Sequence, residues 1–268
     1  MKLEIFFQSH PVFTGPELSH FLASYKPVGA RDRESLLAYH KKKGRVIQVR
    51  NNLFAVVPSK ADPSTYPVDS FLLAARMTKD AVLAFHTALE FNGHAYSVQH
   101  ILRYLALRPV PPVKFRKTAF QGTKFPTALI RKEKTAFEVV TMERLGMELT
   151  VTSLERTIVD VLDRPNLSGS WEEIWRSLES VGFLDLDKVV AYTLLLENAT
   201  TAAKVGFYLE QHRESLMVED KYLKILRDLS PKQPLYLERS NRRTGRLVAG
   251  WNLVVPTEIL DRAWAEVL

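Results

Sequence analysis

The sequence predicts an α+β fold, with a small N-terminal domain followed by a larger domain of mixed helices and strands. Three observations lead to this prediction. Helical patterns in residues 1–60 are followed by two β-rich runs. Residues 61–67 hold two prolines among mainly polar residues, which is typical of a linker. Residues 68–268 contain both helical and strand patterns and are numerous enough to bury a core of their own.

Two helices are expected at the start of the N-terminal domain. Residues 2–9 and 15–25 both carry apolar side chains at helical spacing. Thr14 or Gly15 can cap the second helix, and Pro16 suits its first turn because that position needs no backbone N–H.

A third helix is expected from Arg31 to Lys43, after a turn at Pro27-Val28-Gly29. It stops at Gly44, a residue that fits a left-handed C-cap. The side of this helix that we expect to be buried carries Leu36, Leu37 and His40. The opposite side carries Arg31, Ser35, Tyr39 and Lys42.

Two β-rich runs follow the third helix, residues 46–49 and 53–57. They meet at Asn51-Asn52, and asparagine tolerates the positive φ of a tight hairpin turn. The order of helix, helix, turn, helix and hairpin is that of a winged helix-turn-helix over residues 1–60.

The charge pattern predicts that this domain binds DNA. Residues 1–60 contain 10 Lys and Arg against 4 Asp and Glu, a net charge of +6, while the whole chain has a net charge of +7. A third helix of this kind enters a major groove, where Arg, Lys and Ser reach bases and phosphates. We expect base contacts from the exposed helix side, Arg31, Ser35, Tyr39 and Lys42. We expect phosphate contacts from Lys41, Lys43, Arg45 and Arg50. Asn51 and Arg33 are expected to add further contacts, although Arg33 lies toward the buried side of the helix. The alternative is a well-capped solvated helix end beside an ordinary surface hairpin.

Composition excludes several other classes of function. The chain has no cysteine, which excludes disulfides, zinc ribbons, iron–sulfur clusters and thiol nucleophiles, and favours the cytoplasm. No apolar run is long enough to span a membrane, the first residues lack a signal-peptide pattern, and there is no phosphate-binding glycine loop. We therefore expect no catalytic residues, no cofactor and no membrane partner.

A few polar and aromatic side chains have spacings that suit a metal or catalytic site, but we expect them to be structural. His86, Glu90 and His94 have metal-ligand spacing, but Gly93 ends the helix, so a hydrogen-bonded His86 is expected and no metal site. Arg156 and Asp160 are interpreted as an ion pair on a helix. Glu133 and Glu138 lack the further acidic and lysine partners of a nuclease, and Trp171 and Trp175 are expected to be core anchors.

The second domain is expected to begin with helices at residues 69–77 and 81–92 and to continue with strands between residues 95 and 149. Thr152 is predicted to cap the next helix, with Glu155 at the capping-box position. Further helices are expected at residues 171–180, 186–196, 199–216, 219–229 and from residue 257, and strands at 235–237 and 247–255 flank a polar turn at 240–245.

Several segments resemble the AbiEi family of antitoxins from bacterial type IV toxin–antitoxin systems. They are FHTALEFNG (85–93), VTSLERTIVDVLDRPNLSGSWEEI (151–174), TAAKVGFYLEQH (201–212) and RRTGRLVAGWNLVVP (242–256), together with LLAYHKKKGRVIQVRNNLFAVVP (36–58) in the winged helix. The likeness covers nearly the whole chain. It departs from the family at Asn51-Asn52, where the family often has a glycine.

The resemblance implies a transcriptional autorepressor that binds inverted repeats of operator DNA as paired copies. It also implies an antitoxin that opposes an AbiEii-like nucleotidyltransferase toxin in phage defence. In systems of this type the antitoxin need not form a stable complex with the toxin. A cationic set in the strand region is either a solvated face of a sheet or the candidate antitoxin surface: Lys114, Arg116, Lys117, Lys124, Arg131 and Lys132. Two alternatives stay open, a stand-alone ligand-responsive regulator and a DNA-targeted nuclease.

Overall fold

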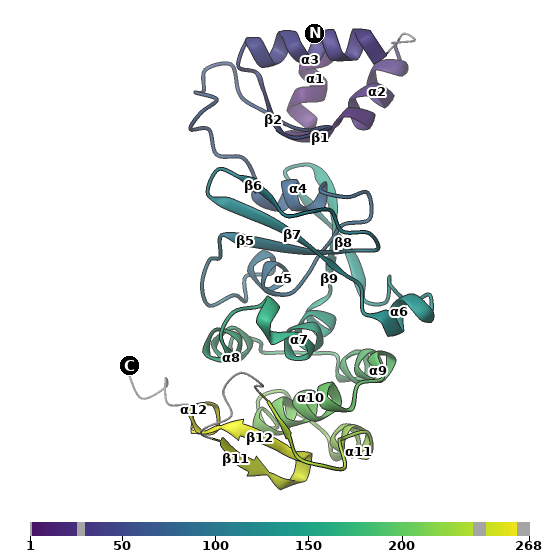
Figure 1. The fold of residues 1–268 in the computed structure, drawn as a ribbon, viewed down its shortest axis with the longest axis vertical. Coiled ribbons are helices and arrows are strands. Elements are labelled where there is room, and N and C mark those ends of the chain that lie inside the picture. Colours follow the sequence, from purple (N-terminus) through teal and green to yellow (C-terminus); the bar gives the residue numbers. More distant parts are fainter. Residues whose placement is uncertain (1, 26–29, 238–244, 262–268) are drawn as a thin grey trace. The chain divides into compact units, whose positions relative to one another are not determined.

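The fold is α+β, as the sequence predicts (Figure 1). The computed structural model describes residues 2–25, 30–237 and 245–261. The chain packs as two compact units. Unit 1 consists of Met1–Leu83, His100–Thr123 and Thr141–Val151, and unit 2 consists of Ala84–Gln99, Lys124–Val140 and Thr152–Leu268.

The predicted winged helix is present in unit 1 with the expected order of elements. Its elements are α1 (Lys2–Ser9), β1 (Val12–Thr14), α2 (Gly15–Ala23), α3 (Ala30–Lys42), β2 (Val46–Arg50) and β3 (Leu53–Val56). The hydroxyl of Thr14 accepts from the backbone N–H of Glu17, and the Glu17 carboxylate accepts from the Thr14 N–H, so the two form a capping box that starts α2. The expected turn at residues 27–29 lies outside the described residues.

A three-stranded sheet in the order β1-β3-β2 closes the winged helix. The hairpin of β2 and β3 turns at Asn51-Asn52, and Asn52 has a φ of 59°, the positive value that such a turn requires. A separate apolar core holds the domain together and consists of Phe6, Phe7, Phe13, Leu18, Leu37, Val46, Phe54 and Val56. Of the residues predicted for the buried side of the third helix, Leu37 belongs to this core, while Leu36 and His40 are half-buried.

The rest of unit 1 is built on a six-stranded sheet in the order β6-β7-β5-β4-β9-β8, most of whose residues belong to this unit. The elements are α4 (Ser70–Ala75), β4 (Val82–Leu83), β5 (Ile101–Ala106), β6 (Val113–Phe115), β7 (Thr118–Lys124), β8 (Val139–Arg144) and β9 (Met147–Thr152). The predicted linker at 61–67 contains no helix or strand, and unit 1 includes residues on both sides of it.

Unit 2 is mainly helical. Its elements are α5 (His86–Phe91), α6 (Thr127–Arg131), α7 (Leu154–Asp163), η1 (Pro165–Leu167), α8 (Trp171–Glu179), α9 (Leu186–Leu196), α10 (Ala199–Gln211), α11 (Asp220–Asp228), β10 (Leu235–Tyr236), β11 (Gly245–Val248), η2 (Ala249–Trp251), β12 (Leu253–Pro256) and α12 (Thr257–Leu260). The strands form a small sheet in the order β10-β12-β11. Trp171 and Trp175 lie in the core, as predicted.

Trp251 packs directly on α10 at Gly206. A β-carbon added to Gly206 would lie 2.1 Å from the Trp251 ring, so only glycine leaves room for the indole. The indole N–H of Trp251 donates to Glu210 one turn further along α10, at 2.7 Å. This contact joins the C-terminal sheet segment to the helical core of unit 2.

Five element predictions need correction. Within the region predicted to form strands, α6 (Thr127–Arg131) is a helix. The helix predicted at 81–92 is wrong in its first half, because residues 82–83 form a strand and Phe85, with a φ of 59°, precedes the helix. The cap of α7 is Ser153 rather than Thr152, since the Ser153 side chain accepts from the N–H of Arg156. The helix predicted at 199–216 ends at Gln211, and the strand predicted at 247–255 is interrupted by a short 3₁₀ turn.

Across the described residues, none of the helices combines the length and apolar character that a membrane span requires. Residues 240–244 of the predicted polar turn lie outside the described part of the chain.

Candidate nucleic-acid interface

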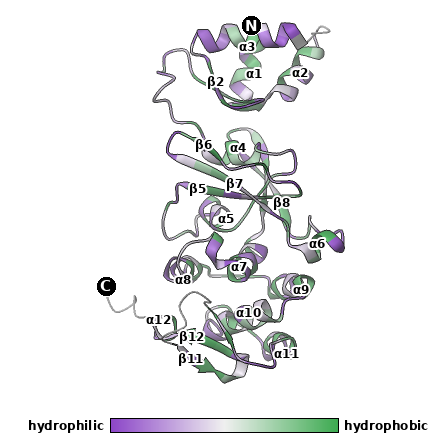
Figure 2. Cartoon of the chain, in the orientation of Figure 1, coloured by the Kyte–Doolittle hydropathy of each residue, from purple (hydrophilic) through white to green (hydrophobic). Residues whose placement is uncertain are grey.

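The exposed face of α3 is the strongest candidate site in unit 1. Arg31, Ser35 and Lys42 are exposed and have no hydrogen-bond or ion-pair partner among the described residues. Tyr39 lies on the same face with 57% of its surface exposed. In Figure 2 much of α3 has the purple of hydrophilic residues. The structure therefore brings the four predicted base-contacting residues to one face, where none is needed to hold the fold.

The opposite face of α3 packs into the winged-helix core, as predicted. Leu37 is 7% exposed. Burial, followed by the charge of Arg45, lowers the pKa of His40, so its imidazole is neutral at pH 7. The positive charge of α3 consequently belongs to its arginines and lysines alone.

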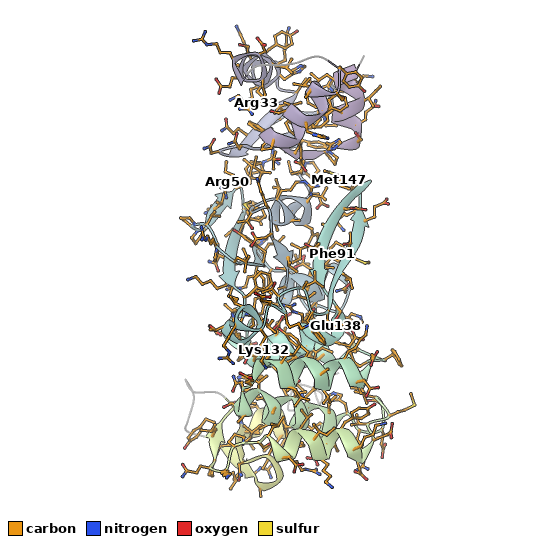
Figure 3. All side chains as sticks on the ribbon, turned by 90° about the vertical axis from the view of Figure 1, so that its right-hand side faces the viewer. Arg33, Arg50, Phe91, Lys132, Glu138 and Met147 are labelled. Carbon is orange, nitrogen blue, oxygen red and sulfur yellow. The ribbon has the colours of Figure 1, made fainter. Side chains whose placement is uncertain are left out.

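Arg33 has a partner inside the domain. Its guanidinium donates to the hydroxyl of Ser19 on α2 at 3.0 Å, and Figure 3 labels it below α3. This agrees with the expected position of Arg33 toward the buried side of the helix. Its place in the DNA-binding set stays a prediction, and the contact with Ser19 indicates a role in holding α2 against α3.

The lysines at the end of α3 remain close to the exposed face. Lys41 donates to the side-chain oxygen of Gln48 on β2 at 3.0 Å, in an exposed position. The Lys43 ammonium lies 5.9 Å from the centre of the Tyr39 ring, at the outer limit of a cation–π contact. Both contacts are solvent-exposed and therefore weak, so both ammonium groups stay accessible to phosphate.

The arginines of the wing are engaged within unit 1, which the sequence did not reveal. Arg45 pairs with Glu4 of α1 at 2.6 Å. Arg50 donates to the backbone carbonyl of Met77 at 3.2 Å. Asn51 at the wing tip is exposed. The phosphate contacts expected from Arg45 and Arg50 stay predictions, and each would require its present partner to be released or shared.

The cationic set proposed from the strand region has members in both units, and its role stays a prediction. Lys114, Arg116 and Lys117 belong to unit 1, around the hairpin of β6 and β7, whereas Lys124, Arg131 and Lys132 belong to unit 2. Arg116 donates to the backbone carbonyls of Tyr66 and Pro63, so it anchors the linker segment.

In unit 2, Arg131 and Lys132 both pair with the carboxylate of Glu197, Lys132 at 2.7 Å. Hydrogen bonding from Lys132, with the charge of Arg131, lowers the pKa of Glu197. Part of the positive charge of this set is therefore neutralised within the fold.

The polar groups interpreted as structural are buried and bonded. Arg156 of α7 is fully buried, pairs with Asp160 at 3.3 Å and donates to the carbonyls of Thr135 and Phe137. Tyr192 donates to the other oxygen of Asp160 at 2.6 Å. His86 is 1% exposed and lies 3.1 Å from Glu173, which confirms the expected hydrogen-bonded histidine.

Among the residues that the structure describes, no three His, Cys, Asp or Glu side chains are grouped so that they could hold a metal ion. His86 lies 3.8 Å from Glu90 and 3.1 Å from Glu173, and its hydrogen bond with Glu173 joins α5 to α8.

Comparison with solved structures gives a structural likeness. No family model matches the chain, and no curated protein matches it. The chain is similar to the crystal structure of the RV2827C protein from Mycobacterium tuberculosis, with a TM-score of 0.57 and 15% sequence identity over 98% of this chain and 94% of that chain. At this identity the likeness concerns the fold and carries no activity with it.

Proposed function

We propose that this chain is a DNA-binding transcriptional repressor of its own operon and the antitoxin of a type IV toxin–antitoxin system. The exposed face of α3 carries the DNA-binding part of the proposal. The side chains of Arg31, Ser35, Tyr39 and Lys42 share that face. None of them forms an ion pair or hydrogen bond with the described residues. Groove-facing side chains of a recognition helix need this freedom, because they must be available to bases and phosphates.

The net charge of +6 on residues 1–60 supports the same proposal. Phosphate neutralisation supplies most of the affinity of non-specific DNA binding and makes it depend on salt. The rest of the chain is nearly neutral, so the polyanion would be attracted to the winged helix.

The direct test is a gel-shift titration of the full-length chain on the DNA upstream of its own gene, at several salt concentrations. We expect saturable binding that weakens as salt rises. Lys224→Ala serves as a matched control, since it removes an exposed lysine of α11 in unit 2. Absence of salt-sensitive binding by the wild-type chain would refute the DNA-binding proposal.

We further propose that two copies occupy one operator. One small recognition helix reads few base pairs, and repressors of this kind use half-sites about one helical turn, roughly 34–36 Å, apart. Footprinting is expected to give two protected half-sites arranged as an inverted repeat. A single asymmetric footprint would contradict pairing.

The antitoxin role rests on the resemblance to the AbiEi family and on no side chain of the structure. Its test is co-expression of the full-length chain with the neighbouring toxin-like gene, followed by growth. We expect Lys42→Ala to lose repression and to keep protection, because Lys42 belongs to the α3 face and unit 2 is unchanged. Loss of both together at equal protein level would show that the two roles are inseparable.

A ligand-responsive regulator is the second candidate function. The observation that favours it is a cleft of about 690 Å³ in unit 1, lined in part by the tip of the wing. The DNA-targeted nuclease stays an untested alternative, which incubation of plasmid with protein and magnesium would detect.

A further inference from the structure

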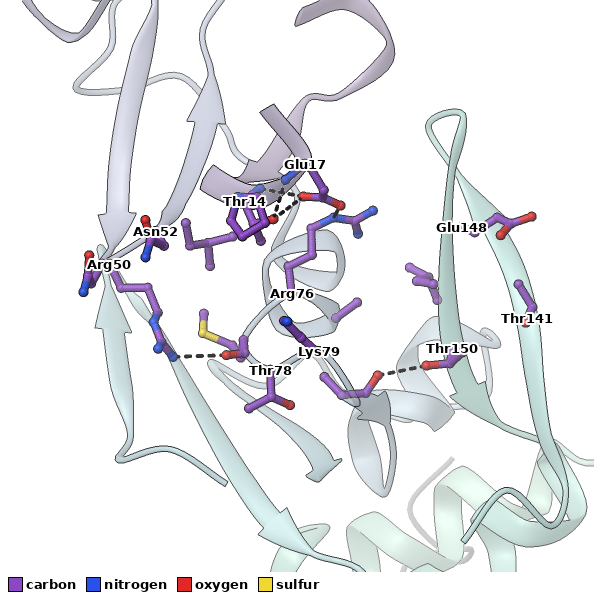
Figure 4. A pocket seen from close by; sticks show the side chains of 17 residues that line it. Thr14, Glu17, Arg50, Asn52, Arg76, Thr78, Lys79, Thr141, Glu148 and Thr150 are labelled. Atoms are coloured by element: carbon purple, nitrogen blue, oxygen red, sulfur yellow. Dashed lines mark hydrogen bonds and ion pairs between the residues drawn. The ribbon is translucent and has the colours of Figure 1, made fainter. Parts of the chain in front are cut away.

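The cleft in unit 1 has the size and walls of a small-molecule site. Its volume of about 690 Å³ lies within the roughly 300–1,000 Å³ typical of ligand pockets. One wall is the wing tip with the start of α2, the second is the segment after α4, and the third comes from β8 and β9 (Figure 4). Its apolar lining includes Leu53, Met77 and Leu149.

The side chains that line the cleft carry more positive than negative charge. Three cations and two carboxylates line it, and Arg76 is paired with Glu17 at 3.3 Å. Lys79 is exposed and has no partner among the described residues. One guanidinium nitrogen of Arg50 donates to the Met77 carbonyl, and the other N–H groups of Arg50 remain able to donate. The remaining carboxylate, Glu148, points away from Lys79 and Arg50 in Figure 4.

We propose that this cleft binds a nucleoside phosphate. The phosphate is held by Arg50 and Lys79, because a phosphate monoester carries a charge of about −1.5 to −2 at pH 7, which two cations match. The nucleoside lies along the apolar wall. The amide of Asn52, which has no partner among the described residues, offers both a donor and an acceptor to the edge of a base.

Binding at this site would be coupled to the wing. Arg50 belongs to β2 of the wing, and Lys79 follows α4. If the proposed DNA binding holds, the ligand's phosphate and a DNA phosphate compete for the single positive charge of Arg50, so the ligand lowers operator affinity. By linkage, the operator lowers ligand affinity by the same factor. This coupling rests on the proposed function, whereas the ligand site itself does not.

The test is isothermal titration calorimetry of the full-length chain, without DNA, against adenosine, guanosine, cytidine and uridine 5′-monophosphates and the four unphosphorylated nucleosides. At least one monophosphate is expected to saturate with a Kd below about 1 mM, and its nucleoside to bind at least about tenfold more weakly. Lys79→Gln is expected to weaken the monophosphate about tenfold, because it removes a charge-assisted hydrogen bond and leaves the apolar wall intact.

Two control variants keep the result decisive. Lys60→Gln removes an exposed lysine of unit 1 that does not line the cleft and is expected to bind as the wild type does. Saturation by no monophosphate, or equal binding by Lys79→Gln and wild type, overturns the proposal. Loss of binding in Lys42→Gln but not in Lys79→Gln places the phosphate on α3 and overturns it as well. Because no DNA is present, failure here leaves the gel-shift test of the proposed function independent.

Discussion

Arg31 and Arg156 both lie near the start of a helix, and their surroundings are opposite. Arg31 of α3 is exposed and has no partner among the described residues. Arg156 of α7 is fully buried, paired with Asp160, bonded to two carbonyls and placed with its guanidinium 5.0 Å from the centre of the Tyr192 ring. A cation that is buried and paired stabilises the fold, whereas a cation that is exposed and unpaired is available to a ligand. The surroundings of the residue, and not its charge alone, therefore indicate its role.

This comparison also sorts the remaining cations of the winged helix. Arg33 and Arg45 resemble Arg156 in having a partner within the fold, although at partly exposed positions. Lys42 resembles Arg31. Substitutions at the first kind of residue should change stability first, and substitutions at the second kind should change DNA binding alone.

The largest effect is expected from Arg156→Ala. Removing one partner of a buried ion pair leaves the buried Asp160 carboxyl without its cation, which costs about 3–5 kcal/mol in the free energy of unfolding. Urea denaturation followed by circular dichroism measures it. Arg31→Ala in the same assay should stay within about 0.5 kcal/mol of wild type. A cost below about 1 kcal/mol for Arg156→Ala would mean that the buried pair of Arg156 and Asp160 does not hold the fold together.

Arg31→Ala should show the converse behaviour on DNA. Loss of a base contact is expected to cost about 1–3 kcal/mol on the operator and to relax the preference for the base concerned. Competition gel shifts with operator and random DNA measure both affinities. Equal weakening on the two DNAs would assign Arg31 to phosphate rather than to a base.

A smaller and more uniform effect is expected from Lys43→Ala. An exposed phosphate contact carries no sequence information, so operator and random DNA should both weaken by a similar factor. The slope of log affinity against log salt should become shallower by about 0.9. An unchanged slope together with unchanged affinity would show that the Lys43 ammonium stays with the Tyr39 ring and does not reach DNA.

The smallest effect is expected at Glu197 of unit 2. Lys132 and Arg131 hold the pKa of its carboxyl below the usual 4.5. Because the folded-state pKa is lowered, the pair stabilises the fold above about pH 4.5 and the contribution is lost as pH falls through the folded-state pKa. In Lys132→Ala, carbon-detected NMR should find the pKa of Glu197 raised toward 4.5. An unmoved pKa would show that Arg131 alone lowers it.

Local patterns predicted much of unit 1 because its signals are local. The capping box at Thr14 and Glu17, the apolar side of α3 and the turn at Asn52 each depend on neighbours a few residues away. The four side chains on the exposed α3 face follow from helical spacing in the same way.

The failures occurred where tertiary context decides. Residues 81–89 are all buried, and an apolar run that is buried on every side has no periodicity to distinguish a strand from a helix. Thr152 and Ser153 are both suited to cap a helix, so the sequence could not fix the register. The contacts of Arg50 with Met77 and of Arg45 with Glu4 join segments 27 and 41 residues apart, which no local pattern reports.

The contact between Gly206 and Trp251 has a consequence for the biosynthesis of unit 2. Helix α10 is synthesised before residue 251, so the surface around Gly206 has no indole to cover it until the chain reaches Trp251. A chain released before Trp251 would keep that surface open and leave Glu210 without its indole donor. We expect such fragments to be bound by chaperones or degraded, so that quality control removes incomplete copies before they compete with the finished protein.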